Sequence, residues 1–327
     1  MSVLLAVVLS AALTACGTGT DKESTSASKP STEQNTTNQT NSNQTADLKT
    51  QYPLTVKDST GESFTFDKAP AKIVSVSPAE TEALFAIGLD QEIVGVSDYD
   101  DYPEAAKSKP KMGGLKPNEE ALIAAKPDIV LTGLTMADDE VKKLRGIGIK
   151  AFKTDPKNVN DVINDIELYG LITDHQKEAK EVTDKMKKDI ADVQDAVKNI
   201  GKDQKMNVYV EFSPGWTVGS GEFMDELITL AGGVNVAGKT PGWHEISEEN
   251  IIAANPNVIL YSKNVVDDKS GKTLDQIIKA RSGWSDIYAI KHDRVFGLDD
   301  NLISRPGPRV TEGLKEVAAA IYPDIFK

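Results

Sequence analysis

Three aromatic residues stand in loop-forming sequence, where stacking on a flat ligand would be their chemistry. Tyr99 follows a predicted buried strand, and Trp216 and Trp243 lie among prolines and glycines that disfavour a core position. Loops after the strands of α/β folds often carry binding residues, and aromatic faces suit flat ligands. For each residue the alternative is a side chain packed beneath a surface loop. Trp284, beside a predicted helix end, is expected to be structural.

Arg305 is a candidate donor to a phosphate or amide group. Two prolines, Pro306 and Pro308, follow it around a glycine and would stiffen the segment that holds the guanidinium group. The alternative for Arg305 is a surface ion pair.

Residue types that serve catalysis or metal binding are scarce. The chain has three histidines (His175, His244 and His292), none four residues from another, and one cysteine, Cys16. Disulfides and the common zinc patterns are therefore excluded, and residues 219–221 lack the spacing of a nucleophile elbow. A net charge of −13 argues against nucleic-acid binding. We expect neither an enzyme nor a bound cofactor.

Two stretches repeat at a constant offset of 129 residues: 118–131 (NEEALIAAKPDIVL) and 247–260 (SEENIIAANPNVIL). Each predicts a capping residue, two glutamates, a helix of about two turns and a buried strand. One interpretation is that the glutamates only interact favourably with the helix dipole. The other is that they form a matched acidic patch on each half, which would suit a two-fold symmetric basic partner. The repeat predicts two similar halves.

Strands and helices alternate through most of the chain. The pattern predicts a hairpin over 53–66 and strands over 73–76, 93–96, 129–132, 149–153, 206–212, 258–261 and 295–298. It predicts helices after Ser77, over 138–145 and 223–230, from 273, and over 310–321. Ser77, Pro78 and Glu80 have the types of a capping box. This rhythm indicates parallel sheets covered by helices.

Residues 174–200 predict one long helix of about 40 Å, because they contain no glycine or proline and carry a single apolar stripe. A coiled-coil surface is the alternative. We therefore predict an α/β fold of two Rossmann-like lobes (51–173 and 201–327), joined by one rigid helix (174–200), with the ligand cleft between the lobes. Such a linker predicts that the lobes close only slightly on a ligand.

The first 50 residues are not expected to belong to the fold. The apolar run 3–15 is too short to span a bilayer and has the form of a signal peptide, residues 1–15. Residues 13–16 (LTAC) resemble the lipobox of bacterial lipoproteins, which implies a lipid on Cys16. Of residues 17–50, 21 of 34 are Ser, Thr, Asn or Gln, which is typical of a tether. We expect a protein anchored on the extracytoplasmic face, with an ordinary exported protein as the alternative.

The whole pattern resembles the substrate-binding proteins of bacterial ABC importers, in the class that serves cobalamin, ferric siderophores and haem. The resemblance runs from about residue 72 to the end. It is carried by residues 73–82 (IVSVSPAETE), 95–103 (GVSDYDDYP), 243–249 (WHEISEE) and 304–309 (SRPGPR). The second, third and fourth of these are similar to the cobalamin-binding members in particular.

The resemblance implies roles for individual residues. Tyr99 matches a tyrosine that contacts the corrin ring, and Trp243 matches a pocket tryptophan of the opposite lobe. Glu120 and Glu249 match the two glutamates that pair with arginines of the permease dimer. A ligand-contacting loop of the second lobe is matched by Asn301, Leu302, Ile303, Ser304 and Arg305.

The resemblance thus implies that a monomer of this protein captures cobalamin and delivers it to a permease dimer with ATPase subunits. Two pocket tryptophans of the cobalamin binder, near residues 113 and 302, are absent here, and Trp216 is the candidate replacement. The alternative is a ferric hydroxamate siderophore or haem, for which Tyr99 or His244 would be the axial ligand. Metal import and hydrolysis are disfavoured by the scattered histidines and the missing nucleophile motif.

Overall fold

The computed structural model describes residues 48–326. The predicted signal peptide, the lipidation site Cys16 and most of the predicted tether lie outside the described residues. Thr50, the last residue of that tether, is buried: its amide donates to the Asp174 carboxylate (2.7 Å) and its hydroxyl to the Leu171 carbonyl (2.7 Å). Contacts with the fold therefore begin at the end of the expected tether.

The first half contains the predicted hairpin and a four-stranded parallel sheet in the order β4-β3-β5-β6. The hairpin strands are antiparallel, and Gly61 occupies the left-handed region at their turn. The strands of this half are β1 (Leu54–Lys57), β2 (Ser63–Phe66), β3 (Ile73–Ser75), β4 (Ile93–Val96), β5 (Ile129–Thr132) and β6 (Ala151–Lys153). Its helices are α1 (Pro78–Ala86), η1 (Glu104–Ser108), α2 (Glu119–Ala125), α3 (Asp138–Gly146) and α4 (Val159–Thr173).

The second half has a parallel sheet in the order β9-β7-β11-β12 and a separate two-stranded ribbon of β8 and β10. Its strands are β7 (Asn207–Glu211), β8 (Trp216–Val218), β9 (Val234–Asn235), β10 (Trp243–Glu245), β11 (Val258–Ser262) and β12 (Val295–Leu298). Its helices are η2 (Lys202–Gln204), α6 (Phe223–Leu230), α7 (Glu248–Ala254), α8 (Leu274–Ala280), α9 (Tyr288–Lys291), α10 (Asp300–Ile303) and α11 (Val310–Ile321).

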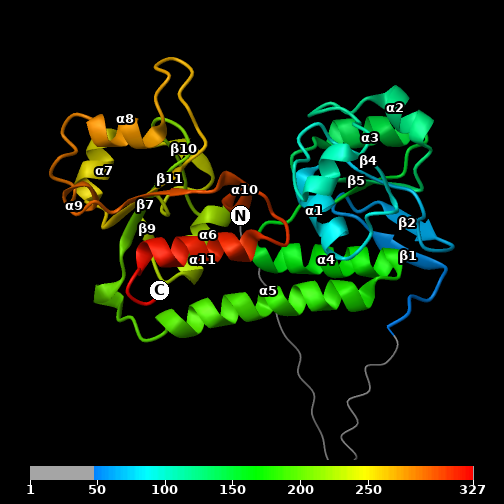
Figure 1. The fold of residues 1–327 in the computed structure, drawn as a ribbon, viewed down its shortest axis with the longest axis horizontal. Helices are drawn as coiled ribbons and strands as arrows, with labels where there is room; N and C mark the ends of the chain where they lie inside the picture. Colours follow the sequence, from blue (N-terminus) through cyan, green and yellow to red (C-terminus); the bar gives the residue numbers. More distant parts are fainter. Residues whose placement is uncertain (1–47, 327) are drawn as a thin grey trace, which may run out of the picture. The chain divides into compact units, whose positions relative to one another are not determined.

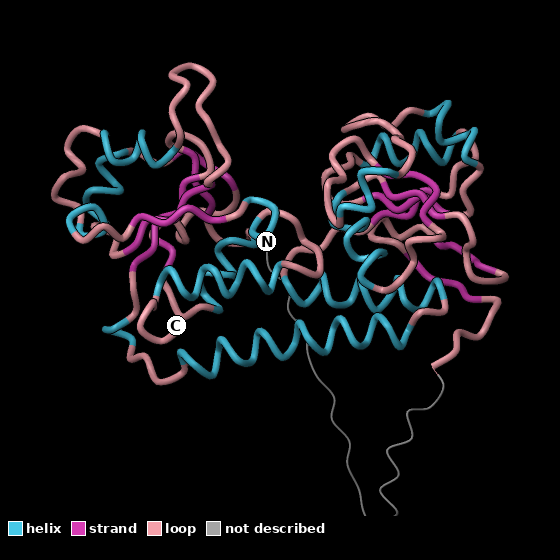
Figure 2. The backbone as a smooth tube through the Cα atoms, viewed as in Figure 1, coloured by secondary structure: helices cyan, strands magenta, loops and turns pink. Residues whose placement is uncertain are grey.

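The two sheets confirm the repeat inferred from sequence. In both, the first strand has the second strand on one side and the third and fourth on the other. Figure 2 shows that in each half the strands lie together with helices around them. Helices α2 and α7 both have seven residues and stand at the 129-residue offset. The Asn118 and Ser247 side chains accept hydrogen bonds from the amides of Ala121 and Asn250, so both cap as predicted.

The long helix is α5 (Gln176–Val197), and it contacts α1 and α4 of the first half and α6 and α11 of the second (Figure 1). Its predicted apolar stripe faces inward, with Met186, Val193 and Val197 buried. Gly170 lets α4 approach α5 closely, because a Cβ at this position would lie 2.4 Å from the Ala179 methyl group of α5. The fold prediction of two α/β lobes joined by one long helix is confirmed.

Four local features differ from the expectations. Helix α4 and the β8–β10 ribbon were not predicted, and residues 300–303 form the short helix α10 instead of a loop. The capping box at Ser77 is wrong: Ser77 stands at the N-cap, but its side chain caps no amide, and Glu80 turns into the interior. Among the described residues, no helix is long and apolar enough to cross a membrane.

Candidate functional site

Tyr99 projects from the loop that follows β4, with 55% of its surface exposed. The loop is anchored by Asp100, whose buried carboxylate accepts the Ser97 amide. Burial raises the pKa of Asp100, although the hydrogen bond from the Ser97 amide acts against this shift. The Tyr99 ring packs beside Gly114, where a Cβ would lie 3.2 Å from the tyrosine hydroxyl. A buried anchor thus holds a largely free aromatic face.

Trp216 and Trp243 lie on the β8–β10 ribbon, 41% and 52% exposed. Trp243 pairs with Val218, and Glu245 with Trp216, which places both tryptophans on one face of the ribbon. The Trp243 ring lies 4.7 Å from that of Phe212, and its indole N–H donates to Glu222 (3.1 Å). The sequence-predicted tryptophans are therefore brought together. His244 pairs with Thr217 on the opposite face of the ribbon and bonds the Gly242 carbonyl through Nδ1 (3.0 Å).

The predicted ligand-contacting segment 301–305 is only partly available to a ligand. Leu302 and Ile303 of α10 are 8% and 2% exposed, so their side chains belong to the interior of the second half. Asn301 is half-buried and Ser304 is exposed. Arg305, the residue singled out for its charge, is committed to ion pairs.

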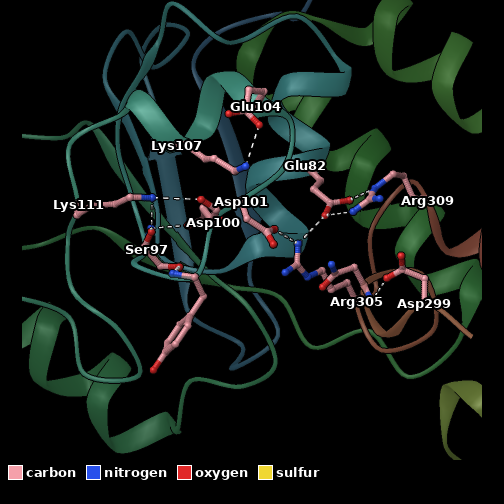
Figure 3. Close-up of polar contacts among 12 residues, drawn as sticks. Glu82, Ser97, Asp100, Asp101, Glu104, Lys107, Lys111, Asp299, Arg305 and Arg309 are labelled. Atoms are coloured by element: carbon pink, nitrogen blue, oxygen red, sulfur yellow. Dashed lines mark hydrogen bonds and ion pairs between the residues drawn. The ribbon is translucent and has the colours of Figure 1, made fainter. Parts of the chain in front are cut away.

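Arg305 and Arg309 of the second half meet two acidic residues of the first (Figure 3). Arg305 donates to Glu82 (3.1 Å) and Asp101 (2.6 Å), and Arg309 donates to both oxygens of Glu82 (2.8 and 2.7 Å). The Glu82 side chain is 1% exposed. Arg309 also stacks on Tyr102, with its guanidinium carbon 3.8 Å from the ring centroid. We call these five residues the junction cluster.

The junction cluster ties the loop that carries Tyr99 to the segment that carries Arg305. Partial burial acts to raise the pKa of Asp101, but the hydrogen bond and charge of Arg305 lower it overall. A cavity of about 330 Å³ lies beside the cluster and contains none of the three aromatic candidates. It is lined by Glu82, Phe85, Ala86, Tyr102, Pro103, Val182, Lys185, Met186, Pro308, Arg309 and Glu312.

A second buried ion pair supports the tryptophan ribbon. Arg281 donates to both oxygens of Glu211 (2.9 and 2.6 Å), whose side chain is fully buried. Glu211 also accepts the Tyr209 hydroxyl (3.1 Å) and the Gly215 amide, next to Trp216 (3.1 Å). The guanidinium group lies 4.4 Å from the buried Trp284 ring, which confirms a structural role for that tryptophan.

The two glutamates in each repeat have different surroundings. Glu119 pairs with Lys143 (2.5 Å), and Glu248 lies 3.5 Å from Arg281. Their neighbours Glu120 and Glu249 are exposed and make no ion pair within residues 48–326. The carboxylates predicted for docking are therefore the ones left free on each half.

Acidic residues gather near the end of β6. Glu80 is 3% exposed and accepts the Thr154 hydroxyl (2.9 Å) through one oxygen only. Burial raises the pKa of Asp165 to about 8, and the negative charges of Glu80, Asp161 and Asp155 add to the shift. Among the described residues, no group of three or more His, Cys, Asp or Glu side chains has the arrangement of a metal site.

This environment predicts a pH-dependent stability. A carboxyl group whose pKa is higher in the folded state stabilises the fold below its unfolded pKa, and that contribution is lost as pH rises toward the folded value. The free energy of unfolding of the wild type should therefore decline as pH rises toward about 8, the folded-state pKa of Asp165. Asp165→Asn should flatten this decline and raise the melting temperature at pH 8, whereas the exposed Asp139→Asn should not. Equal pH profiles for wild type and Asp165→Asn would contradict the assignment.

Sequence reasoning missed Glu82, Asp101 and Arg309 as junction residues, and Glu211 and Arg281 as the support of the ribbon. One signal was available for Glu82. It stands on an otherwise apolar face of the first helix with no local cation, which indicates a distant partner. For Arg281 and Glu211, 70 residues apart, the sequence carries no comparable signal.

Known proteins resemble this chain in sequence and in fold. The profile of a family described as periplasmic binding protein matches residues 73–302. An uncharacterized ABC transporter substrate-binding lipoprotein of Bacillus subtilis is 36% identical over 290 residues, covering 86% of this chain and 90% of the relative. A cobalamin-binding protein of Halobacterium salinarum is 27% identical, covering 85% and 76%. The crystal structure of a possible iron-binding (periplasmic solute-binding) protein from Staphylococcus epidermidis has a TM-score of 0.67 at 31% identity, covering 78% and 100%.

Proposed function

Because the chain belongs to the periplasmic binding protein family, we propose that it captures cobalamin outside the membrane and delivers it to an ABC-type permease. The coarser role follows from the family and the relatives. The protein is a substrate-binding component of an ABC importer, of the class that serves cobalamin, haem and siderophores, and it is not an enzyme.

The observation that supports cobalamin is the set of three exposed aromatic rings on rigid supports. Tyr99 stands above the anchored Asp100, while Trp216 and Trp243 share a ribbon face tied to the core through Glu211. A corrin ring is broad and nearly flat, and its amide arms need hydrogen-bond partners. Asn301 and Ser304 are the accessible polar candidates of the second half.

Arg305 has a conditional role in this proposal. In the structure its guanidinium group is held by Glu82 and Asp101, and Asp101 is the more exposed partner, at 48% against 1%. A phosphate of the ligand would compete with Asp101 rather than with Glu82, because the exposed carboxylate is more easily released to water.

A ferric siderophore or haem is the second candidate. It is favoured by the likeness to the possible iron-binding protein of Staphylococcus epidermidis, which is more similar in sequence than the halobacterial cobalamin binder. For haem, Tyr99 or His244 would supply an axial ligand.

Delivery requires a surface that the permease recognises. We assign this role to Glu120 and Glu249, the free glutamates of the two repeats. A lipid on Cys16 would hold the protein at the extracytoplasmic face, in keeping with the lipoprotein relative. We expect the monomer to act with the permease and its ATPase subunits, and cobalamin to be cargo rather than cofactor.

Aromatic substitutions test the cobalamin site. Tyr99→Ala and Trp243→Ala should each weaken cyanocobalamin binding by about 30-fold, because truncating an anchor aromatic typically costs about 2 kcal/mol. Titration calorimetry measures the change. Tyr288→Ala, at a 38% exposed aromatic outside the site, is the matched control. If both site variants bind cyanocobalamin with wild-type affinity, these residues do not form a cobalamin site.

A further inference from the structure

Two exposed isoleucines stand at equivalent positions of the repeat. Ile123 on α2 is 53% exposed and Ile252 on α7 is 40% exposed, and the 129-residue offset relates them. Single exposed apolar residues are ordinary on protein surfaces. A matched pair, at the same position of the same element in both halves, calls for a shared reason.

The isoleucines are not needed by the cores of their halves. The residue before each one, Leu122 or Ile251, is fully buried and packs into the local core. Each short helix therefore already has its inward apolar contact. Ile123 and Ile252 lie on the outward side, where burial would come from another molecule.

Each isoleucine lies beside a free carboxylate. Glu120 precedes Ile123 by three residues and Glu249 precedes Ile252 by three, a spacing that places side chains on the same face of a helix. Glu119 and Glu248, by contrast, lie against cations of their own halves. One face of each helix thus presents a negative charge with an aliphatic side chain next to it.

We propose that these glutamate–isoleucine pairs, Glu120 with Ile123 and Glu249 with Ile252, form the two contact patches for the permease. This inference rests on the docking role proposed above. Two equivalent patches fit a partner with two equivalent subunits, each offering a basic side chain beside an apolar pocket. Burying the isoleucine excludes water from the neighbouring ion pair and so strengthens it.

Binding of the protein, in the presence of cyanocobalamin, to its permease reconstituted in nanodiscs tests the proposal. Ile123→Ala and Ile252→Ala should each weaken docking by about tenfold, and the double variant by about 100-fold. Melting temperature and ligand affinity should not change, because both side chains are exposed. Ile147→Ala with Ile325→Ala, at residues 41% and 44% exposed, is the matched control pair.

The glutamates separate the possible outcomes. Glu120→Gln with Glu249→Gln should also weaken docking and should reduce its salt dependence, whereas the isoleucine variants should keep the wild-type salt dependence. If the glutamine variant binds like wild type, the docking face itself is wrongly assigned. If the glutamine variant fails to dock while the isoleucine variants bind like the control pair, the isoleucine contact is overturned and the glutamate docking stands.

Discussion

Glu82→Gln is expected to lower the free energy of unfolding by about 3–5 kcal/mol, the usual cost of breaking a buried ion pair. The Glu82 side chain is 1% exposed and pairs with both Arg305 and Arg309. The substitution removes its negative charge. Two guanidinium groups of the second half then face each other without a shared counter-ion. For a folded part of this size the melting temperature should fall by roughly 10 °C.

The same cluster supplies the control for this prediction. Asp101 pairs with Arg305 at 2.6 Å but is 48% exposed, so Asp101→Asn should cost about 0–1 kcal/mol. Thermal unfolding of the two variants, side by side, decides the matter. A loss for Glu82→Gln no greater than that for Asp101→Asn would show that the junction cluster does not join the halves energetically.

Arg281→Leu should be comparably damaging, by about 3–5 kcal/mol, because it leaves Glu211 buried without a cation. The remaining donors to Glu211 are the Tyr209 hydroxyl and the Gly215 amide. A buried carboxyl group costs less when it carries a proton than when it is ionised. Because protonation is favoured at low pH, the deficit should be smaller at pH 5 than at pH 8.

Chemical denaturation at these two pH values measures the Arg281→Leu effect. Lys180→Gln, which breaks an exposed pair with Asp184, is the control and should leave stability unchanged. A deficit that is the same at both pH values would contradict the assignment of this cost to a buried carboxylate without a cation.

Much of the fold could be predicted from sequence because its signals are local. The buried strands over 93–96 and 129–132, the caps Asn118 and Ser247, and the helix over 310–321 are all found as predicted. Each depends on residues within one or two turns of one another. The 129-residue repeat extended this local information to the whole architecture, because equivalent segments fold in equivalent places.

The rest depends on contacts between distant residues. Glu82 and Arg309 are 227 residues apart. The surroundings of Glu82 in the sequence indicate a distant partner, but nothing in the sequence identifies Arg309 as that partner. The β8 and β10 strands have three residues each and exist only through their pairing with one another. Leu302 and Ile303 were expected at a ligand, yet helix α10 turns both into the core. In each case tertiary packing decides what local sequence leaves open.

The central claim concerns the ligand, and a thermal-unfolding comparison tests it most directly. Residues 46–327, whose described part (48–326) belongs to one compact unit, would be melted with cyanocobalamin, a ferric hydroxamate siderophore or haem in parallel. A ligand at 100 times its dissociation constant adds about 2.7 kcal/mol, which is a shift of several degrees at this size. We predict that only cyanocobalamin raises the midpoint. A shift with the siderophore or haem, and none with cyanocobalamin, would contradict the claim and leave the fold and family unchanged.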